Sequence, residues 1–411
     1  MKRNSGPANI LPVILAGGEG LRLAPISTPE QPKPFVPLPD GNSLLTHTLK
    51  RVADTAYFLP PLLVGQEKHR FSLLNHAREA DCAPCAILLE PQAKNTTMAI
   101  AVAAHYALHY APDTILAILP ADQVIEPQAA WLGAVLAATK AAQGYDKLCL
   151  LGIAPTRPDP HFGYLRPGLP LASSAAMEVI QFIEKPDDPQ PLMGHCYWNA
   201  GQFFATPACL AALIKAHAPE IDHAARAAFT AAHTAWEFTS LGATAYLSAV
   251  PRAFDRAIVE KSRVIAVRLE AQWSDVGTLE AWEGYTGRSA IDYNDLPVRT
   301  DRPWGFYEML SATPGRLEKR LTLYPGCRLS LQRHSHRSEQ WQLLTGQAEI
   351  QLDGELFYPV MGQQISIPAH SWHRLHNIGR EKLIIHEIQT GMPSEADIER
   401  REDDYGRNII Q

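Results

Sequence analysis

A continuous apolar run near the start of the chain, Ile10–Leu15, is followed at once by a cluster of glycines. A strand that is apolar at every position is buried on both faces, which is typical of the parallel sheets of α/β proteins. Further short apolar runs follow at Leu62–Val64, Ala86–Leu89, Thr114–Leu119 and Lys147–Gly152. Helical stretches separate these runs, and this alternation predicts an α/β fold for the first part of the chain.

Three stretches in this part have helical character. They are Leu44–Ala53, with apolar residues near one face, and the two alanine-rich segments Thr96–Tyr110 and Pro127–Ala142. Asn95 stands directly before the second of them and is a residue type suited to cap a helix N-terminus. We therefore expect Asn95 to be that cap.

The pattern changes after a polar, turn-prone stretch at residues 288–302, which we interpret as a linker between domains 1–287 and 303–411. Beyond it the candidate strands are short and separated by Gly, Pro or Asn, and Asp353-Gly354 is a two-residue hairpin signal. The second domain is therefore expected to be a small all-β barrel. Its expected strands are 318–324, 341–345, 348–352, 355–358, 364–367 and 383–388.

Composition narrows the functional class. An apolar fraction of 46% supports sizeable cores and excludes disorder as the main description of these 411 residues. A net charge of −6, with 37 basic and 43 acidic residues, argues against a nucleic-acid binder with a basic surface. No apolar run approaches a membrane span, and the six cysteines are scattered. We expect a cytoplasmic enzyme without membrane or nucleic-acid partners; homo-oligomer formation stays open.

The glycine loop after the first strand is the first candidate site. Gly17, Gly18 and Gly20 would let backbone N–H groups approach phosphates, while Arg22 and Lys33 would neutralise their charge. A dinucleotide fingerprint starting at Gly18 would need a glycine where Leu23 stands, and a Walker loop would need Gly-Lys-Ser/Thr. The loop therefore predicts a polyphosphate site of another kind.

A second candidate site lies in the C-terminal domain. Side chains two residues apart on a strand share a face, so Gln332, His334 and His336 are expected to point the same way. Glu339 would come from the adjoining strand and His373 from a later one. The set of Gln332, His334, Glu339 and His373 suits Zn²⁺ or another divalent metal, whereas we expect His336 to be structural.

Several further segments make the sequence recognisable. The glycine loop through Pro32-Lys33-Pro34-Phe35 resembles the signature of sugar-phosphate nucleotidyltransferases, and Gln332–Glu339 with His373 is similar to the two cupin motifs of phosphomannose isomerases. Together the motifs resemble the bifunctional mannose-1-phosphate guanylyltransferase/mannose-6-phosphate isomerase family, the type II phosphomannose isomerases. The other segments that carry this resemblance are Glu90–Thr96, Leu119–Asp122, Phe182–Pro186, Trp198–Gly201, Asp255 with Val259–Ser262, Trp273–Thr278, Arg302–Gly305 and Glu402–Arg407.

The resemblance implies a Rossmann-like nucleotidyltransferase domain with a mixed, mostly parallel sheet, followed by a cupin. In the first domain it implies Mg²⁺ held by Asp122 and Asp275, nucleotide contacts from Asn95 and Thr96, and catalytic roles for Arg22 and Lys33. The sugar phosphate would be bound by Gly163, Glu184, Lys185, Asn199 and Lys261.

The implied reactions are the formation of GDP-mannose from GTP and mannose 1-phosphate, and the interconversion of mannose 6-phosphate and fructose 6-phosphate in the cupin, for surface polysaccharide synthesis. Arg374 and Arg407 are candidates for holding the isomerase substrate's phosphate. The family usually has a β-helical spacer where this chain has only residues 278–303, so most of that spacer is missing.

Two alternatives stay open at the level of sequence. The cupin could be a structural or regulatory sugar-binding module beside an active transferase. The transferase could also accept another pair of substrates, such as glucose 1-phosphate with dTTP or UTP, because no residue in the sequence identifies the base or the sugar on physical grounds. A sugar-nucleotide sensor without activity is less favoured, since Arg22, Asp122 and Asp275 are all present.

Overall fold

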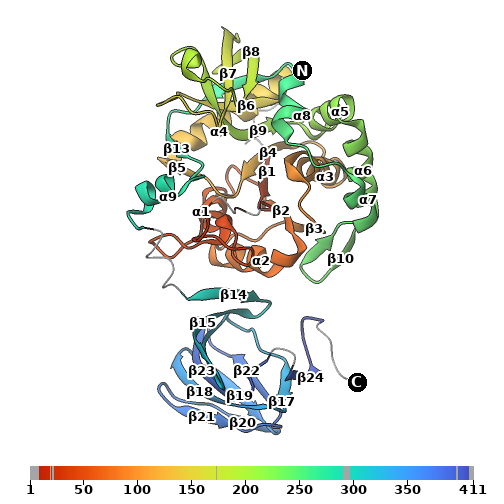
Figure 1. Ribbon diagram of the computed structural model, residues 1–411. Helices are drawn as coiled ribbons and strands as arrows, with labels where there is room; N and C mark the ends of the chain where they lie inside the picture. Colours follow the sequence, from red (N-terminus) through yellow and green to blue (C-terminus); the bar gives the residue numbers. More distant parts are fainter. Residues whose placement is uncertain are drawn as a thin grey trace. The chain divides into compact units, whose positions relative to one another are not determined.

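The structure is a computed structural model that describes residues 9–18, 20, 23–172, 174–289, 297–394 and 397–406. The chain forms two compact units, residues 1–290 and 291–411 (Figure 1). Among the described residues, no helix is long and apolar enough to cross a bilayer. All six cysteines are free thiols, including the neighbouring Cys82 and Cys85.

The first unit is built on a mixed sheet with the order β10-β11-β3-β2-β1-β4-β9-β6-β12-β8-β7. Pairing is parallel from β11 through β3, β2 and β1 to β4, and again between β6 and β12. The expected α/β class and mixed sheet are confirmed. Parallel pairing is less extensive than expected, because β9 runs antiparallel to both β4 and β6. The strands are β1 (Ile10–Leu15), β2 (Leu62–Gln66), β3 (Ala86–Glu90), β4 (Ile115–Pro120), β6 (Cys149–Ile153), β7 (Gly163–Pro170), β8 (Ala176–Glu184), β9 (Tyr197–Ala205), β10 (His233–Ala235), β11 (Phe238–Ser240) and β12 (Ile265–Arg268), with β5 (Val124–Glu126) and β13 (Gln272–Ser274) paired separately.

Helices cover both faces of this sheet. Along β1, Ile10 and Ile14 pack into one core with α1, α2 and α4, while Leu11 and Val13 pack into the other with α3, α5 and α6. Figure 1 shows α5, α6 and α7 along one side of the unit. Burial on both faces explains why β1 is apolar at every position. The helices are α1 (Leu44–Arg51), α2 (Arg70–Glu79), α3 (Asn95–Tyr110), α4 (Gln128–Tyr145), α5 (Pro207–His217), α6 (Pro219–Thr230), α7 (Ala243–Ser248), α8 (Phe254–Ala257) and α9 (Leu279–Thr286), with 3₁₀ turns η2 (Lys33–Phe35), η3 (Glu67–His69), η4 (Gln190–Leu192) and η5 (Val259–Lys261).

The carboxyl ends of β1, β3 and β4 lie at one edge of the sheet, because these strands belong to the parallel block. They carry the glycine loop, Glu90 and Asp122 to the same place. The antiparallel strand β9 brings its beginning, with Asn199, to this edge. In open α/β sheets ligands bind at the carboxyl ends of the strands, so this edge is where a site is expected.

The second unit is an all-β barrel of two sheets, β14-β15-β16-β23-β18-β21 and β20-β19-β22-β17-β24. Its apolar core is centred on the fully buried Trp341 with Leu323, Ile350 and Leu375. Asp353 and Gly354 join β19 to β20 with φ values of 47° and 94°, the positive pair that the predicted two-residue turn requires. The strands are β14 (Val298–Arg302), β15 (Gly305–Thr313), β16 (Arg316–Leu323), β17 (Leu331–His334), β18 (Arg337–Thr345), β19 (Ala348–Leu352), β20 (Glu355–Phe357), β21 (Gln364–Ile367), β22 (His373–Asn377), β23 (Leu383–Gly391) and β24 (Ile398–Glu402).

Candidate functional site

A cavity of about 650 Å³ opens at the carboxyl edge of the first unit's sheet. Its wall joins segments far apart in the sequence, from the glycine loop, the start of α3, the end of β4 and the start of β9. Of the predicted site residues it brings together Gly17, Gly18, Gly20, Asn95, Thr96 and Asp122. The nucleotide-binding set therefore surrounds one space, large enough for a drug-sized ligand.

Gly20 is the loop glycine that sterics require, because a Cβ there would lie 2.6 Å from the Cβ of Lys33 and 2.8 Å from its backbone nitrogen. A Cβ on Gly17 would meet only the end of the Glu90 side chain. Gly20 also has φ of +62°, which favours glycine. A Cβ on Gly18 would meet nothing within 4 Å. The close backbone approach at Gly20 is therefore what lets Lys33 pack against the loop.

Lys33 connects the two candidate metal aspartates. The residue is buried in η2, and its Nζ donates to Asp122 Oδ2 at 2.7 Å and to the backbone carbonyl of Asp275. Asp122 follows β4 and Asp275 follows β13, so the three predicted residues come from elements distant in sequence. The structure thus brings them together around one ammonium group.

A second cavity, of about 580 Å³, lies on the other side of Asp275 and is lined by Phe162, Trp198 and Trp273. The turn that holds Asp275 is strained: the next residue, Val276, is fully buried with φ of 45°, a conformation that β-branched residues rarely adopt. Such strain persists where the surroundings hold it, and it clusters at functional sites.

The carboxylates of Asp122 and Asp275 fit Mg²⁺ by their chemistry. Both are acceptor-only oxygen groups, Asp122 in the lining of the first cavity and Asp275 in that of the second, and Mg²⁺ is usually held by one or two carboxylates together with substrate phosphates. The side chain of Asp122 is 34% exposed, so a ligand in the cavity can reach it.

A buried hydrogen-bond chain supports the segment that carries Asp122. The indole of Trp131 donates to Gln202, whose amide donates to Gln123, whose amide donates in turn to the carbonyl of Ala200, at 3.0, 2.9 and 2.7 Å. The buried Arg51 donates to the carbonyl of Gln123 at 3.0 Å. Gln123 therefore ties the segment after β4 to β9.

Asn95 does not cap α3 as predicted. The helix begins at Asn95 itself, with Lys94 at the cap position and no side-chain cap bond. Asn95 has φ of 65°, and its amide oxygen accepts only from the N–H and hydroxyl of Thr96. The Thr96 hydroxyl accepts from the N–H of Phe254 at 2.8 Å. Both side chains remain exposed at the cavity.

Three of the predicted sugar-phosphate residues, Glu184, Lys185 and Asn199, interact with Asp255, which the sequence analysis placed in a motif without giving it a role. Gly163 and Glu184 are register partners on β7 and β8, Lys185 follows, and Asn199 Nδ2 donates to Asp255 Oδ1 at 2.7 Å. Burial, followed by the negative charge of Glu184, raises the pKa of Asp255 to about 6. Asp255 lines the first cavity on α8.

Glu90 is a second carboxylate that the sequence analysis gave no role. It ends β3, lines the first cavity, and accepts a hydrogen bond from the Tyr246 hydroxyl. Burial raises its pKa to about 7. Its place at the carboxyl end of a buried strand, like that of the segment before Asp122, is the signal that could have identified it.

The structure does not place three predicted site residues, Arg22, Lys261 and Arg407, beside the other site residues. Lys261 ends η5 with an exposed side chain that contacts none of the other described sugar-phosphate residues. Arg22 and Arg407 lie outside the described residues.

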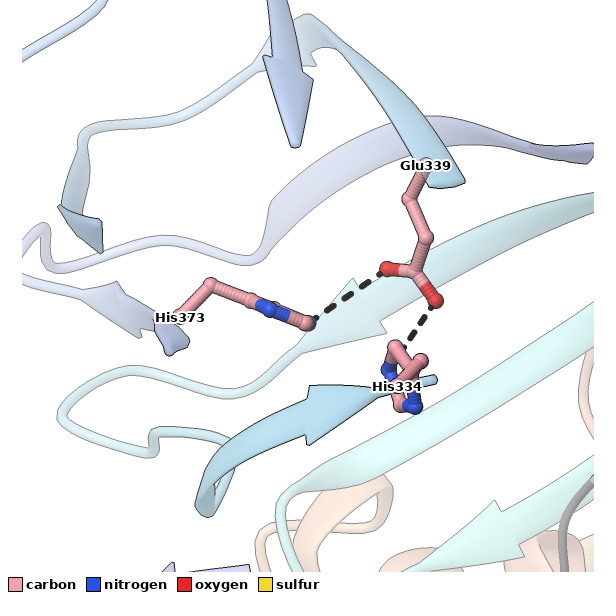
Figure 2. A group of neighbouring side chains, drawn as sticks. All are labelled: His334, Glu339 and His373. Carbon is pink, nitrogen blue, oxygen red and sulfur yellow. Dashed lines mark ion pairs between the residues drawn. The ribbon is translucent and has the colours of Figure 1, made fainter. Parts of the chain in front are cut away.

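The second unit places His334, Glu339 and His373 together in the barrel, all buried, with one ligand atom from each within 4.8 Å of the others (Figure 2). His334 Nε2 lies 3.2 Å from Glu339 Oε1, and His373 Nε2 lies 3.6 Å from Glu339 Oε2. Neither Glu339 Oε2 nor His373 Nε2 has a hydrogen-bond partner in the described structure. Two orphaned acceptor atoms facing each other fit a bound cation, because unsatisfied buried polar atoms are costly.

The fourth predicted ligand, Gln332, lies opposite His373 in the pairing of β17 with β22. It lines a small cavity of about 60 Å³ together with Arg337 and Glu339. Burial lowers the pKa of His373, which favours the neutral imidazole that a metal needs. The residues present therefore fit a divalent metal held by nitrogen and oxygen ligands.

A second buried carboxylate lies beside this group. Gln389 Nε2 donates both to Glu339 Oε1 at 3.1 Å and to Glu387 Oε2 at 3.0 Å, and the indole of Trp341 donates to Glu387 Oε1 at 3.0 Å. Burial, followed by the negative charge of Glu339, raises the pKa of Glu387 above its usual range. The sequence prediction omitted Glu387, although its alternation with Gln389 on one apolar strand places both on the inner face.

One prediction for this unit is wrong, and a second predicted residue lies apart from the metal candidates. His336 does not share the orientation of Gln332 and His334, because β17 ends at His334 and the exposed His336 ring pairs with Asp397 at 2.9 Å. Arg374 follows His373 on β22, and alternation sends its side chain to the opposite face, where it pairs with Glu402 at 3.0 Å. Arg374 is therefore not in the cavity with the metal candidates.

Fold and sites together define a nucleotidyltransferase joined to a small β-barrel with a candidate metal site. Residues 11–286 match the family model described as nucleotidyl transferase, and residues 292–403 match the one described as mannose-6-phosphate isomerase C-terminal. The chain belongs to the nucleotidyl transferase family and carries the C-terminal domain of the isomerase family.

Relatives share this arrangement over almost the whole chain. The xanthan biosynthesis protein XanB of Xanthomonas campestris pv. campestris (strain B100) is 33% identical, covering 97% of this chain and 100% of the relative. A mannose-1-phosphate guanylyltransferase of Klebsiella pneumoniae is 30% identical with the same coverage. The crystal structure of a mannose-6-phosphate isomerase from Helicobacter pylori matches with a TM-score of 0.54 and 26% identity, covering 65% of this chain and 99% of the other. The XanB alignment spans 470 positions, so at least 59 of them have no counterpart among these 411 residues.

Proposed function

We propose that the first unit transfers GMP from GTP to mannose 1-phosphate, releasing pyrophosphate and GDP-mannose. The observation that supports this most directly is the ammonium of Lys33 between Asp122 and Asp275, beside a cavity whose wall includes the glycine loop. We take guanine as the base and mannose as the sugar because the Klebsiella pneumoniae relative is a mannose-1-phosphate guanylyltransferase.

The proposed chemistry needs no general base, because the attacking sugar phosphate is already ionised. Two polyanions must be brought together, so catalysis rests on positioning and charge neutralisation. Lys33 would neutralise the nucleotide phosphates and Arg22 the leaving pyrophosphate. Mg²⁺, held by Asp122 and Asp275, would supply charge stabilisation at the α-phosphate when bound.

The sugar phosphate would be held by the group around Asp255. Glu184 and Asn199 would bind sugar hydroxyls, and Lys185 and Lys261 would bind the phosphate. Lys185 has φ of 49°, so its backbone is held in a conformation that orients the side chain beside Glu184, 3.5 Å away. Gly163 leaves room there, because a Cβ would lie 2.9 Å from Glu184 Oε2.

For the second unit we propose the interconversion of mannose 6-phosphate and fructose 6-phosphate. A divalent metal such as Zn²⁺, held by Gln332, His334, Glu339 and His373, would polarise the sugar oxygens when bound. The match of residues 292–403 to the isomerase C-terminal model supports this assignment. Together the two activities would provide GDP-mannose in the cytoplasm for surface polysaccharide synthesis.

A matrix of nucleoside triphosphates and sugar 1-phosphates, with Mg²⁺ and a pyrophosphate readout, tests the first proposal. GTP with mannose 1-phosphate is expected to be the fastest pair, and Asp122→Ala and Asp275→Ala are each expected to abolish turnover. Asp113→Ala is the matched control, because Asp113 is exposed and remote from both cavities. Full activity in either metal-site variant would contradict the two-carboxylate model.

The second proposal is tested by isomerase activity in the full-length chain. His334→Ala and Glu339→Ala are expected to lose that activity while pyrophosphate release in the first unit persists. An intact chain without isomerase activity at any metal tested would favour the alternative, a cupin that serves as a structural or regulatory sugar-binding module.

A further inference from the structure

The C-terminal strap, which we define as residues 397–406, pairs with the strand that carries two of the proposed metal ligands. Within it β24 runs antiparallel to β17, with Arg400 opposite Gln332 and Ile398 opposite His334. Figure 1 shows β24 beside β17 at the end of the chain. The strap is therefore the direct strand neighbour of the segment that carries Gln332 and His334.

Asp397, the first residue of the strap, contacts three consecutive residues of the ligand-bearing turn. Its backbone oxygen lies 3.2 Å from His334 Nδ1. Its carboxylate accepts from the N–H of Ser335 at 3.2 Å and from that of His336 at 3.0 Å. One residue thus fixes both the ring of His334 and the backbone that follows it.

The contact to His334 determines where the imidazole proton lies. A backbone carbonyl can only accept a hydrogen bond, so Nδ1 must carry the hydrogen, which leaves Nε2 with a lone pair. Nε2 faces Glu339, and its lone pair accepts a hydrogen bond from the guanidinium of Arg337 at 3.1 Å, which a bound metal would replace. Hydrogen bonds of this kind behind a metal-binding histidine set its tautomer and ring orientation.

We propose that Asp397 is the positioning residue for His334, and that its side chain holds the carbonyl that aims Nε2 of His334 at the metal. This inference rests on the metal site proposed for the second unit. The carboxylate acts through the turn: by capping the two N–H groups it fixes the distance between residue 397 and residue 334.

A general role in anchoring the strap is separable from this one, because the strap has other attachments. Arg333 pairs with Glu399 at 2.7 Å, Arg374 with Glu402 at 3.0 Å, and Arg328 with Asp404 at 2.9 Å. The Tyr405 hydroxyl also donates to the carbonyl of Arg328 at 3.1 Å. Loss of the Asp397 carboxylate leaves all of these contacts in place.

The test is metal binding by the full-length chain after chelation, with Zn²⁺ followed by calorimetry and Co²⁺ by its visible absorption. Asp397→Ala is expected to lower the affinity for both Zn²⁺ and Co²⁺ about 10–100-fold, which is the usual effect of losing a group that orients a metal ligand. It is also expected to change the Co²⁺ spectrum, since the ring of His334 turns. Asp397→Asn, which keeps one acceptor oxygen, is expected to restore part of the affinity.

The control is Asp404→Asn, which loosens the far end of the strap and is expected to bind both metals within about twofold of wild type. Pyrophosphate release verifies that each variant's first unit is folded. If the Asp397→Ala variant binds both metals with wild-type affinity and gives the wild-type Co²⁺ spectrum, Asp397 does not position His334, although the metal-site proposal still holds. If wild-type protein binds neither metal, or binds them equally after His334→Ala, the metal site itself is wrong and this inference falls with it.

Discussion

Replacing Gly20 by alanine should disable the transferase through Lys33. Gly20 has φ of +62°, and an added Cβ would lie 2.6 Å from Lys33 Cβ and 2.8 Å from its backbone nitrogen. The left-handed conformation costs alanine about 1–2 kcal/mol, and forcing atoms into a packed contact costs about 1–3 kcal/mol more. The substitution should therefore destabilise the first unit by about 2–5 kcal/mol.

The same clash should displace Lys33 from Asp122 and Asp275. A misplacement on the order of 1 Å in a positioning group lowers the rate about 100-fold. Pyrophosphate release at saturating substrates gives the rate. Thermal unfolding gives the stability, with an expected drop in Tm of roughly 5–15 °C for a domain of this size.

Gly144→Ala is the matched control, because a Cβ there would meet nothing within 4 Å and Gly144 lies on α4, outside the lining of both cavities. It should retain Tm and most of the activity. Equal rates and equal Tm values for the two variants would refute the view that contact between the loop and Lys33 organises the site.

Three further outcomes are expected. Because burial raises the pKa of Glu90 to about 7, the folded state holds this proton more tightly than the unfolded chain. The stability of the first unit should then fall as pH rises from about 4.5 to 7, and Glu90→Gln should flatten that slope in urea titrations; an unchanged slope would contradict it. Gln202→Leu removes a partner from Trp131 and Gln123 and should cost about 1–3 kcal/mol for each polar group, measured by urea unfolding. Removal of metal by a chelator should abolish isomerase activity and lower the second unit's stability by about 2.7 kcal/mol relative to metal at 100 times its Kd, and re-addition should restore both.

Much of the fold follows from local pattern. Unbroken apolar runs such as Ile10–Leu15 occur because β1 contacts a helical layer on each face, and that burial is visible in the sequence. The Asp353-Gly354 turn is also local, because its two positive φ values depend on these two residue types. What could not be predicted is the insertion of β9 antiparallel into the middle of the sheet, since strand order depends on long-range packing.

The candidate sites were likewise predictable only where a residue belongs to a local motif, and not where its role depends on contacts between distant segments. Lys33 contacts both Asp122 and Asp275, whereas Asp255 and Glu90 were given no role because the motifs that contain them do not show which carboxylate is buried. Their burial becomes apparent only when segments distant in sequence meet. The side chain of Arg374 lies on the opposite face from that of its neighbour His373, since adjacent residues of a strand cannot share a face, and its role in phosphate binding stays a prediction.

The contact between Lys33 and Asp275 has a consequence for how the protein is made. These residues are 242 positions apart, whereas Lys33 and Asp122 are 89 apart. At about 5–20 residues per second, a ribosome needs roughly 12–50 s after Lys33 to reach Asp275. During that interval the nascent chain has the glycine loop, Lys33 and Asp122 but not the second carboxylate. The growing polypeptide therefore acquires the proposed pair of metal-binding carboxylates only after nearly all of the first unit has been synthesised.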